Sequence, residues 1–141
     1  MIRKLEKEDI NNIMEIWLDS TIKGHDFIDE KYWRDNYFKV RDIYVPMSET
    51  FVYEENESIK GFISVIEENF IGALFVDSNS FRKGIGSKLI DFALEKYEGL
   101  NLAVYKENKS AIEFYKYKNF EVVCEQINEE TGFMEYIMKS K

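Results

Sequence analysis

Apolar side chains in the amino-terminal part of the chain recur at the spacing of a helix. A short strand is predicted at residues 1–5, and the helical face after it consists of Ile10, Ile13, Met14 and Trp17. Residues 21–46 carry a further apolar pattern, which predicts a second helix through Tyr32, Trp33, Tyr37 and Val40. Because the residue before a proline avoids helical backbone, Pro46 is predicted to end that helix.

From Thr50 the hydrophobic period changes to two, the period of a strand with one buried face. Phe51 and Tyr53 alternate in the first such strand, and residues 59–66 return after the polar turn Asn56-Glu57-Ser58. The turn Glu67-Glu68-Asn69 then leads into residues 70–76, an uncharged run far too short to span a membrane. The pattern therefore predicts three consecutive strands of one sheet.

Two further helices and three further strands are predicted in the rest of the chain. The first helix has the apolar face Ile85, Leu89, Ile90, Ala93, Leu94 and Tyr97. It crosses over to a strand at residues 100–105, which we expect to be parallel to residues 70–76, with room for a ligand where the two diverge. The second helix begins at the N-cap Asn108 and ends near Asn119. Strands at residues 120–126 and 133–139 then close the sheet as an antiparallel pair.

The segment between the third strand and its helix carries Gly84 and Gly86 at the helix start. Unpaired N–H groups and the positive end of the helix dipole meet there, and a missing β-carbon lets phosphate oxygens approach the backbone. Arg82, Lys83 and Lys88 add a basic patch to a chain whose net charge is -8. A flexible connection is the alternative, but the cations favour a pyrophosphate site. The spacing matches neither a P-loop nor a dinucleotide fingerprint.

The composition fits one domain that spans residues 1–141. Apolar residues make up 45% of the chain, ample for a core of that size. Carboxylates outnumber Lys and Arg by 27 to 19, which disfavours nucleic acid and anionic lipid as partners and attracts a cationic acceptor. The charged amino terminus lacks the apolar segment of a secretory signal, so we expect a cytoplasmic protein.

The single cysteine and the single histidine limit the available chemistry. Cys124 cannot form an internal disulfide, and within a predicted strand we expect it to be a small buried residue. No His, Cys and carboxylate cluster has the spacing of metal ligands, so no metal is predicted.

The glycine turn and the segment of residues 108–115 that follows it in the chain resemble two motifs of the GCN5-related N-acetyltransferase (GNAT) superfamily. The family's cofactor turn reads Arg/Gln-x-x-Gly-x-Gly/Ala, and this chain has both glycines but Phe81 at the first position, followed by Arg82. The second motif, Asn-x-x-Ala-x-x-Phe-Tyr, is complete at residues 108–115. Trp17-Leu18, Gly24-His25 and Tyr32-Trp33-Arg34-Asp35 are also similar to the bacterial YiaC-type branch, whose members are regarded as protein lysine acetyltransferases.

The resemblance implies an α/β (α+β) fold and an acetyl-CoA site. The fold would be a twisted, mixed and mostly antiparallel sheet of about six or seven strands with about four helices, splayed at a parallel pair where the cofactor binds. The implied cofactor residues are Phe75, Val76, Arg82, Lys83, Gly84, Ile85, Gly86, Ser87, Asn108, Ala111, Phe114 and Tyr115. Among them, the Val76 N–H would face the thioester oxygen, and residues 83–87 would hold the pyrophosphate.

Acetyl transfer to an amine needs a base and an acid. Tyr115 matches the family tyrosine that protonates the departing thiolate, although a core aromatic is the alternative. Glu67, Glu68 and His25 are candidates for the base, while a solvated turn for the glutamates and a hydrogen-bonded imidazole for His25 are the alternatives. Trp17 and Trp33 could wall the acceptor site together with His25, and Trp17 also fits simple core packing.

The sequence is compatible with several functions. One is an enzyme that transfers the acetyl group of acetyl-CoA to a primary amine by direct attack in a ternary complex. The acceptor would be a protein lysine, an α-amine or a small-molecule amine. The rival is a module that holds acyl-CoA as a sensor without turnover, which the departure at Phe81 allows. The protein is expected to be a monomer or a homodimer.

Overall fold

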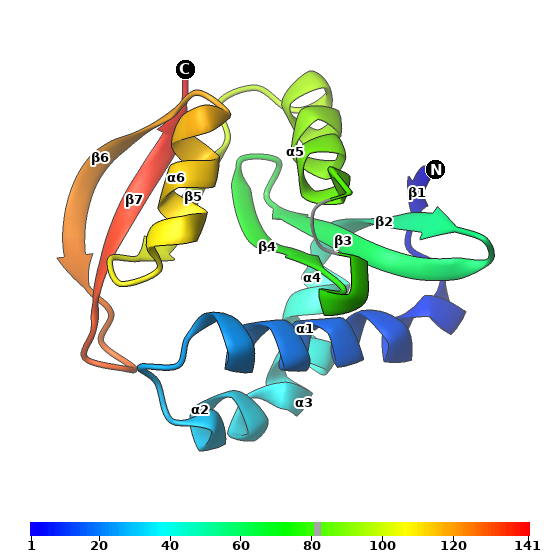
Figure 1. The fold of residues 1–141 in the computed structure, drawn as a ribbon, viewed down its shortest axis with the longest axis horizontal. Coiled ribbons are helices and arrows are strands. Elements are labelled where there is room, and N and C mark those ends of the chain that lie inside the picture. Colours follow the sequence, from blue (N-terminus) through cyan, green and yellow to red (C-terminus); the bar gives the residue numbers. More distant parts are fainter. Residues whose placement is uncertain (81–82) are drawn as a thin grey trace.

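The computed structural model describes residues 1–80 and 83–141 and is built on one seven-stranded sheet (Figure 1). The strand order is β1-β2-β3-β4-β5-β7-β6, and every neighbouring pair is antiparallel except β4 and β5. This confirms the predicted mixed sheet with one parallel pair. The strands are β1 Ile2–Lys4, β2 Ser48–Glu55, β3 Ser58–Ile66, β4 Phe70–Val76, β5 Asn101–Tyr105, β6 Phe120–Ile127 and β7 Met134–Ser140.

Helices cover both faces of the sheet and are more finely divided than the sequence suggested. The α-helices are α1 Ile10–Gly24, α2 Glu30–Asp35, α3 Tyr37–Lys39, α4 Val45–Met47, α5 Ile85–Lys96 and α6 Lys109–Tyr117. Short 3-10 turns lie at η1 Lys7–Asp9 and η3 Ser78–Ser80, and a π-helical turn, η2, at Val40–Tyr44. No helix among the described residues is long and apolar enough to cross a membrane.

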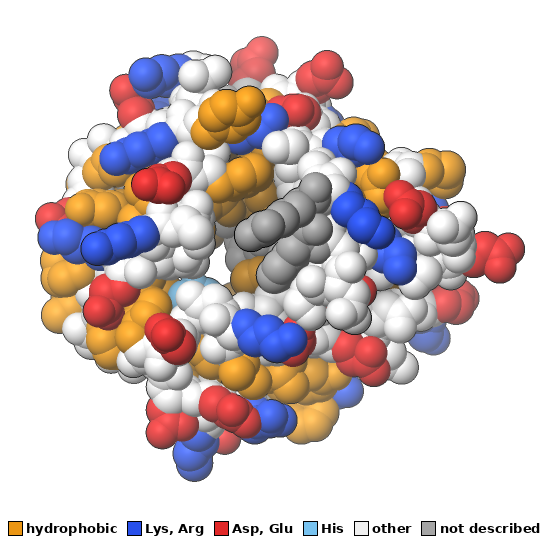
Figure 2. Space-filling view, in the orientation of Figure 1, with side chains coloured by type: hydrophobic (Ala, Val, Ile, Leu, Met, Phe, Trp, Pro, Cys, Tyr) orange, Lys and Arg blue, Asp and Glu red, His pale blue; other side chains and the backbone are white. Residues whose placement is uncertain are grey.

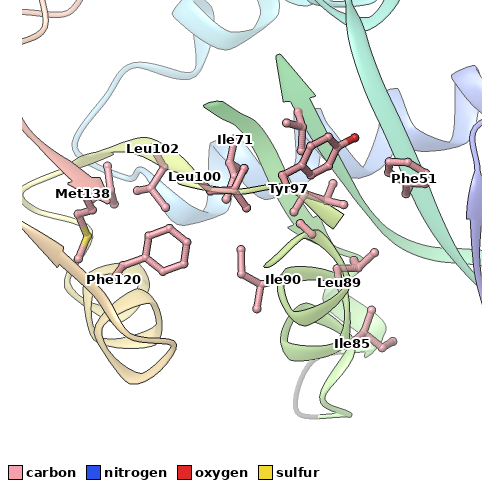
Figure 3. Packing of buried hydrophobic residues seen from close by; sticks show 14 of the residues in the cluster. Phe51, Ile71, Ile85, Leu89, Ile90, Tyr97, Leu100, Leu102, Phe120 and Met138 are labelled. Carbon is pink, nitrogen blue, oxygen red and sulfur yellow. The ribbon is translucent and has the colours of Figure 1, made fainter. Parts of the chain in front are cut away.

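Two hydrophobic cores hold these layers together. One lies under α5 and α6, where Ile85, Leu89 and Ile90 belong to the same cluster as sheet residues such as Ile71 and Leu102 (Figure 3). The other lies under α1 and α2, around Ile13, Met14, Trp17 and Trp33. The two faces of β4 belong to different cores, because Ala73 and Phe75 pack with the second core and Leu74 and Val76 with the first.

The second predicted helix is wrong in its extent and in its stop signal. Residues 30–47 form α2, α3, the π-helical turn and α4 in succession. Pro46 lies within this helical run, in α4, and does not end it. Ser48, with an extended backbone, ends that helix instead.

The expected burial of Cys124 is also wrong. The residue is exposed because it lies on β6, one of the two edge strands of the sheet, on which every residue after Phe120 is exposed. The strand was located correctly, but hydrophobic periodicity does not show which strand will be at the edge.

Candidate active site

The parallel strands β4 and β5 separate after two paired positions. Phe70 pairs with Asn101 and Ile71 pairs with Leu102, and no pairing follows toward the end of β4. The register of β4 against β3 shifts between Ala73 and Ile71, so Gly72 is an extra residue. Such a bulge bends a strand and raises its twist. The predicted splay is therefore present, and it opens toward the carboxyl end of β4.

Backbone groups of β4 face the splay at Leu74 and Val76. The Asp77 N–H donates to the Lys60 carbonyl of β3 at 2.8 Å. Since successive residues of a strand direct their hydrogen-bonding groups to opposite sides, Phe75 also faces β3, while Leu74 and Val76 face the opening. The Ser20 hydroxyl of α1 accordingly reaches the Val76 carbonyl at 3.4 Å. The Phe75 backbone is turned toward β3, so the geometry does not support a backbone contact between Phe75 and the cofactor, although Phe75 lines both cavities.

Gly84 lies immediately before α5 in a backbone conformation that favours glycine. Its φ of 75° is left-handed, and its carbonyl accepts the first helical hydrogen bond, from Lys88 N–H at 3.0 Å. The N–H groups of Ile85, Gly86 and Ser87 thus begin α5 without a helical partner. A β-carbon at Gly86 would lie 3.7 Å from Val76 Cγ2 and 3.8 Å from Phe114 Cζ, which places this glycine against the end of β4 and against α6.

The two described lysines beside the glycine turn, Lys83 and Lys88, differ in their contacts. Lys83 is exposed next to Gly84. Lys88 instead lies against the Tyr53 hydroxyl at 3.5 Å and over its ring. Phe81 and Arg82 lie outside the described residues, so the predicted phosphate contact of Arg82 stays a prediction.

Two cavities meet in the splay between β4 and β5. The larger, about 460 Å³, runs from the glycine turn to α6 and is called the cofactor cavity below. The second, about 280 Å³, lies between α1, α2 and β5 and is called the acceptor cavity. Figure 2 shows the molecule hollowed between α6 and β4. Both cavities are lined by His25, Leu74, Phe75, Asn108, Ala111 and Tyr115.

Tyr115 lies on α6, positioned by the second motif. Asn108 caps the helix, since its side-chain oxygen accepts from the Ala111 N–H at 3.4 Å, as the sequence predicted. The Tyr115 ring packs edge-on against Phe114 and Phe120. Burial raises the pKa of its phenol above the usual value, so the hydroxyl keeps its proton at neutral pH. The Tyr115 side chain therefore packs in the core and also lines both cavities.

His25 is a buried, neutral imidazole at the end of α1. Its Nδ1 lies 2.9 Å from the Thr21 carbonyl oxygen, and because a carbonyl only accepts, Nδ1 carries the proton and Nε2 the lone pair. Burial lowers the pKa of the ring. The rings of Trp33 and Tyr105 surround it, with centroids at 5.0 and 5.3 Å. Its neighbour Thr21 is itself tied to the Trp17 carbonyl at 2.8 Å.

The two tryptophans wall the acceptor cavity from α1 and α2. Trp17 and Trp33 are 7% and 8% exposed, and their rings meet edge to face at 6.2 Å. Among the described residues, Trp33 Nε1 is the one buried side-chain nitrogen or oxygen without a hydrogen-bond partner. A buried N–H of this kind is destabilising unless it finds an acceptor.

Glu67 and Glu68 lie at the opposite end of β4 from the splay. Both are exposed, in the turn before Phe70, and Val76 is about 20 Å further along the strand. Burial and the hydrogen bond with Glu49 raise the pKa of the Tyr97 phenol, and the charge of nearby Glu68 adds to that shift. The structure does not bring these carboxylates to the cavities, so it does not support either of them as the base.

Sequence reasoning missed Leu74, Ser20 and Tyr105. Leu74 lines both cavities, Ser20 lines the cofactor cavity, and Tyr105 lines the acceptor cavity. Tyr105 is the last residue of β5, and this end of the parallel pair was where a ligand was expected to enter. That position alone could have indicated it.

Known proteins are similar to this chain in sequence and in architecture. Residues 10–120 match the model of the Acetyltransferase (GNAT) family. The chain is 38% identical over 138 residues to "Peptidyl-lysine N-acetyltransferase YiaC" of Escherichia coli (strain K12), a match that covers 98% of this chain and 94% of that protein. It is 31% identical over 123 residues to "Peptidyl-lysine N-acetyltransferase YjaB" of Salmonella typhimurium, covering 86% and 83%.

Solved structures have the same fold. Apo-form YjaB from Escherichia coli has a TM-score of 0.85 at 25% identity, over 99% of this chain and 95% of that chain. The PaiA N-acetyltransferase of Thermoplasma acidophilum in complex with coenzyme A has a TM-score of 0.80 at 19% identity, over 100% and 98%. The chain therefore belongs to the GNAT family of acetyltransferases. It is an enzyme that transfers the acetyl group of acetyl-CoA to an amine.

Proposed function

We propose that this enzyme acetylates lysine side chains of proteins or peptides by direct attack on acetyl-CoA in a ternary complex. The observation that carries the proposal is the meeting of two cavities at His25 and Tyr115. A cofactor arm and an acceptor amine can enter from different sides and meet without a covalent enzyme intermediate. The names of the YiaC and YjaB relatives support a peptidyl-lysine acceptor.

The proposed cofactor contacts use backbone N–H groups at the start of α5 and on β4. These groups have no hydrogen-bond partner within their own helix or strand. The N–H groups of Ile85, Gly86 and Ser87 suit a pyrophosphate, and their position at a helix start adds the helix dipole. The N–H groups of Leu74 and Val76 suit the pantetheine amide and the thioester oxygen, because they face the splay. Lys83 and Arg82 would supply positive charge.

His25 and Tyr115 are the proposed base and acid. As the amine nitrogen bonds to the acetyl carbon, the Nε2 lone pair of His25 accepts the proton that becomes acidic on that nitrogen. As the carbon–sulfur bond breaks, the Tyr115 hydroxyl donates to the sulfur. Trp33 Nε1 would donate to a carbonyl of the acceptor.

Residues 1–141 are proposed to act as one acetyltransferase domain in the cytoplasm. The pairing of all seven strands in one sheet supports a single domain. The compartment is supported by a lone cysteine, which permits no internal disulfide.

Calorimetry with acetyl-CoA, followed by mass spectrometry of a lysine peptide incubated with enzyme and acetyl-CoA, tests this function. We expect saturable binding and a single acetyl group on the lysine side chain. Acetylation of a small amine such as spermidine, with the peptide unmodified, would replace the peptide acceptor by a small-molecule one.

A further inference from the structure

A third cavity lies beside the acceptor cavity, on the α1 side of the sheet. Its volume is about 230 Å³, and its walls are α1, the segment of residues 37–47 and strands β3 and β4. Cavities of about 150 Å³ already hold a benzene ring in proteins. The lining residues are Met14, Trp17, Val40, Tyr44, Val45, Ser48, Phe62, Ser64, Ile66, Phe70, Gly72 and Ala73.

This apolar cavity adjoins the place where acetyl transfer is proposed. Trp17, Gly72 and Ala73 line both it and the acceptor cavity. Gly72 is the bulged residue at which β4 leaves β5. An acceptor that reaches the splay along β4 would therefore have its neighbouring groups over the apolar cavity.

The walls favour an apolar occupant. The two serines in the lining are already engaged, because the Ser48 hydroxyl donates to the Tyr44 carbonyl at 2.5 Å and the Ser64 hydroxyl shares a hydrogen bond with Thr50 at 2.7 Å. The remaining lining is almost entirely hydrocarbon and aromatic. A charged or polar group placed here would lose hydration and find few hydrogen bonds in return, because most of the lining is apolar.

The π-helical turn forms one wall of the cavity, and partly exposed apolar and aromatic side chains of the same segment lie near its edge. The Val45 N–H donates to the Val40 carbonyl, so Val40, Tyr44 and Val45 all line the cavity. π-Helical turns are rare and frequently occur at functional sites. Tyr44 is 40% exposed at the edge, and Met47, 51% exposed, lies on the same segment.

We propose that the apolar cavity binds the side chain next to the acetylated amine, and so selects peptide acceptors with a leucine- or phenylalanine-sized neighbour. The inference rests on the proposed function, since it assumes a peptide acceptor in the acceptor cavity. The two sites adjoin each other, because Trp17, Gly72 and Ala73 line both cavities. The mostly apolar lining favours an apolar neighbour over a polar one.

The first test compares two lysine peptides that differ only by leucine or alanine beside the lysine. We expect kcat/KM to favour the leucine peptide by roughly tenfold or more, because burying a leucine side chain gives at least that ratio. Val40→Phe fills the cavity and should bring the ratio near one, with the alanine peptide still acetylated. The matched control is Ile43→Phe on the same turn, since Ile43 is 55% exposed and does not line the cavity. Equal rates for the two peptides with the unaltered enzyme would overturn the inference and leave the acetyltransferase function intact.

The second test needs no turnover and separates the two proposals. Amide NMR signals of Gly72 and Ala73 should shift saturably on titration with N-acetyl-leucinamide, and much less with N-acetyl-glycinamide. The shifts should be lost in Val40→Phe and kept in Ile43→Phe. An unresponsive Gly72–Ala73 region would overturn the apolar site. Saturable shifts in an enzyme that acetylates neither peptide would instead overturn the peptide acceptor.

Discussion

The imidazole Nδ1 of His25 lies 2.9 Å from the backbone carbonyl oxygen of Thr21, one helical turn earlier in α1. This contact selects one tautomer, in which Nδ1 carries the proton and Nε2 the lone pair. The carbonyl favours the protonated ring, but burial opposes it more strongly and lowers the pKa of His25. The ring is therefore neutral at physiological pH and ready to accept a proton.

Stability should fall in mild acid because of His25. Its folded pKa is lower than the unfolded value of about 6.5, so the unfolded chain binds the proton first as the pH falls. The free energy of unfolding should then drop below about pH 6.5, at up to about 1.4 kcal/mol per pH unit, until the folded pKa is passed. Urea unfolding of the wild type and of His25→Gln between about pH 5 and pH 8 measures this. Equal pH dependence in the two proteins would contradict it.

The base role of His25 is tested separately by chemical rescue. His25→Ala should lose roughly 100-fold in kcat, a typical contribution of a general base, with the affinity for acetyl-CoA kept. Free imidazole should restore part of the rate, because the vacated space lies on both cavities. A rate that is low and insensitive to imidazole would assign His25 a structural role alone.

Tyr115 has a matched control on its own helix. Tyr115→Phe removes the hydroxyl and keeps the packing on Phe114 and Phe120, so kcat should fall by roughly 100-fold at unchanged thermal stability. Tyr117→Phe, in a residue that is 80% exposed, should change neither. Release of free thiol, followed with a disulfide reagent, measures the step directly. Unchanged thiol release in Tyr115→Phe would remove it as the acid.

Much of the fold could be predicted because most elements keep a single hydrophobic period. The strands, α1, α5 and α6 were located on that basis, and the cap at Asn108 and the turn at Gly84 follow from local chemistry. Helix was predicted within residues 30–47, but its division into short elements was not, because the π-helical turn depends on how that segment fits against α1 and the sheet. On β4, the sequence named both Phe75 and Val76 as cofactor residues, and only the structure separates the directions of their backbone groups. Whether Phe75 or Val76 faces the splay depends on the register with β3, which the bulge at Gly72 and the Asp77–Lys60 contact determine.

Gly84 is expected to serve both folding and cofactor binding. Its φ of 75° strains any residue with a β-carbon, so Gly84→Ala should lower the free energy of unfolding by about 1 kcal/mol and weaken acetyl-CoA binding by displacing the start of α5. Gly99→Ala is the control, because Gly99 has a φ of 64° and does not line the cofactor cavity. It should show the loss of stability with unchanged calorimetric affinity. Equal affinity in both variants would mean that the turn does not hold the cofactor.

Substitutions in the turn at Glu67 and Glu68 should raise stability, in contrast to Gly84→Ala. The same substitutions also test whether either glutamate is the base. Both residues have positive φ, 53° and 63°, and the Asn69 N–H donates to the Ile66 carbonyl, a pattern that favours Asn-Gly. The double variant Glu67→Asn, Glu68→Gly removes left-handed strain, so we expect the free energy of unfolding to rise by roughly 1 kcal/mol. Because the turn lies about 20 Å along β4 from the splay, the kcat and its pH profile should stay unchanged. Denaturant unfolding and a pH–rate profile check the two halves. A large fall in kcat, with the acid limb displaced, would return one of these glutamates to the role of base.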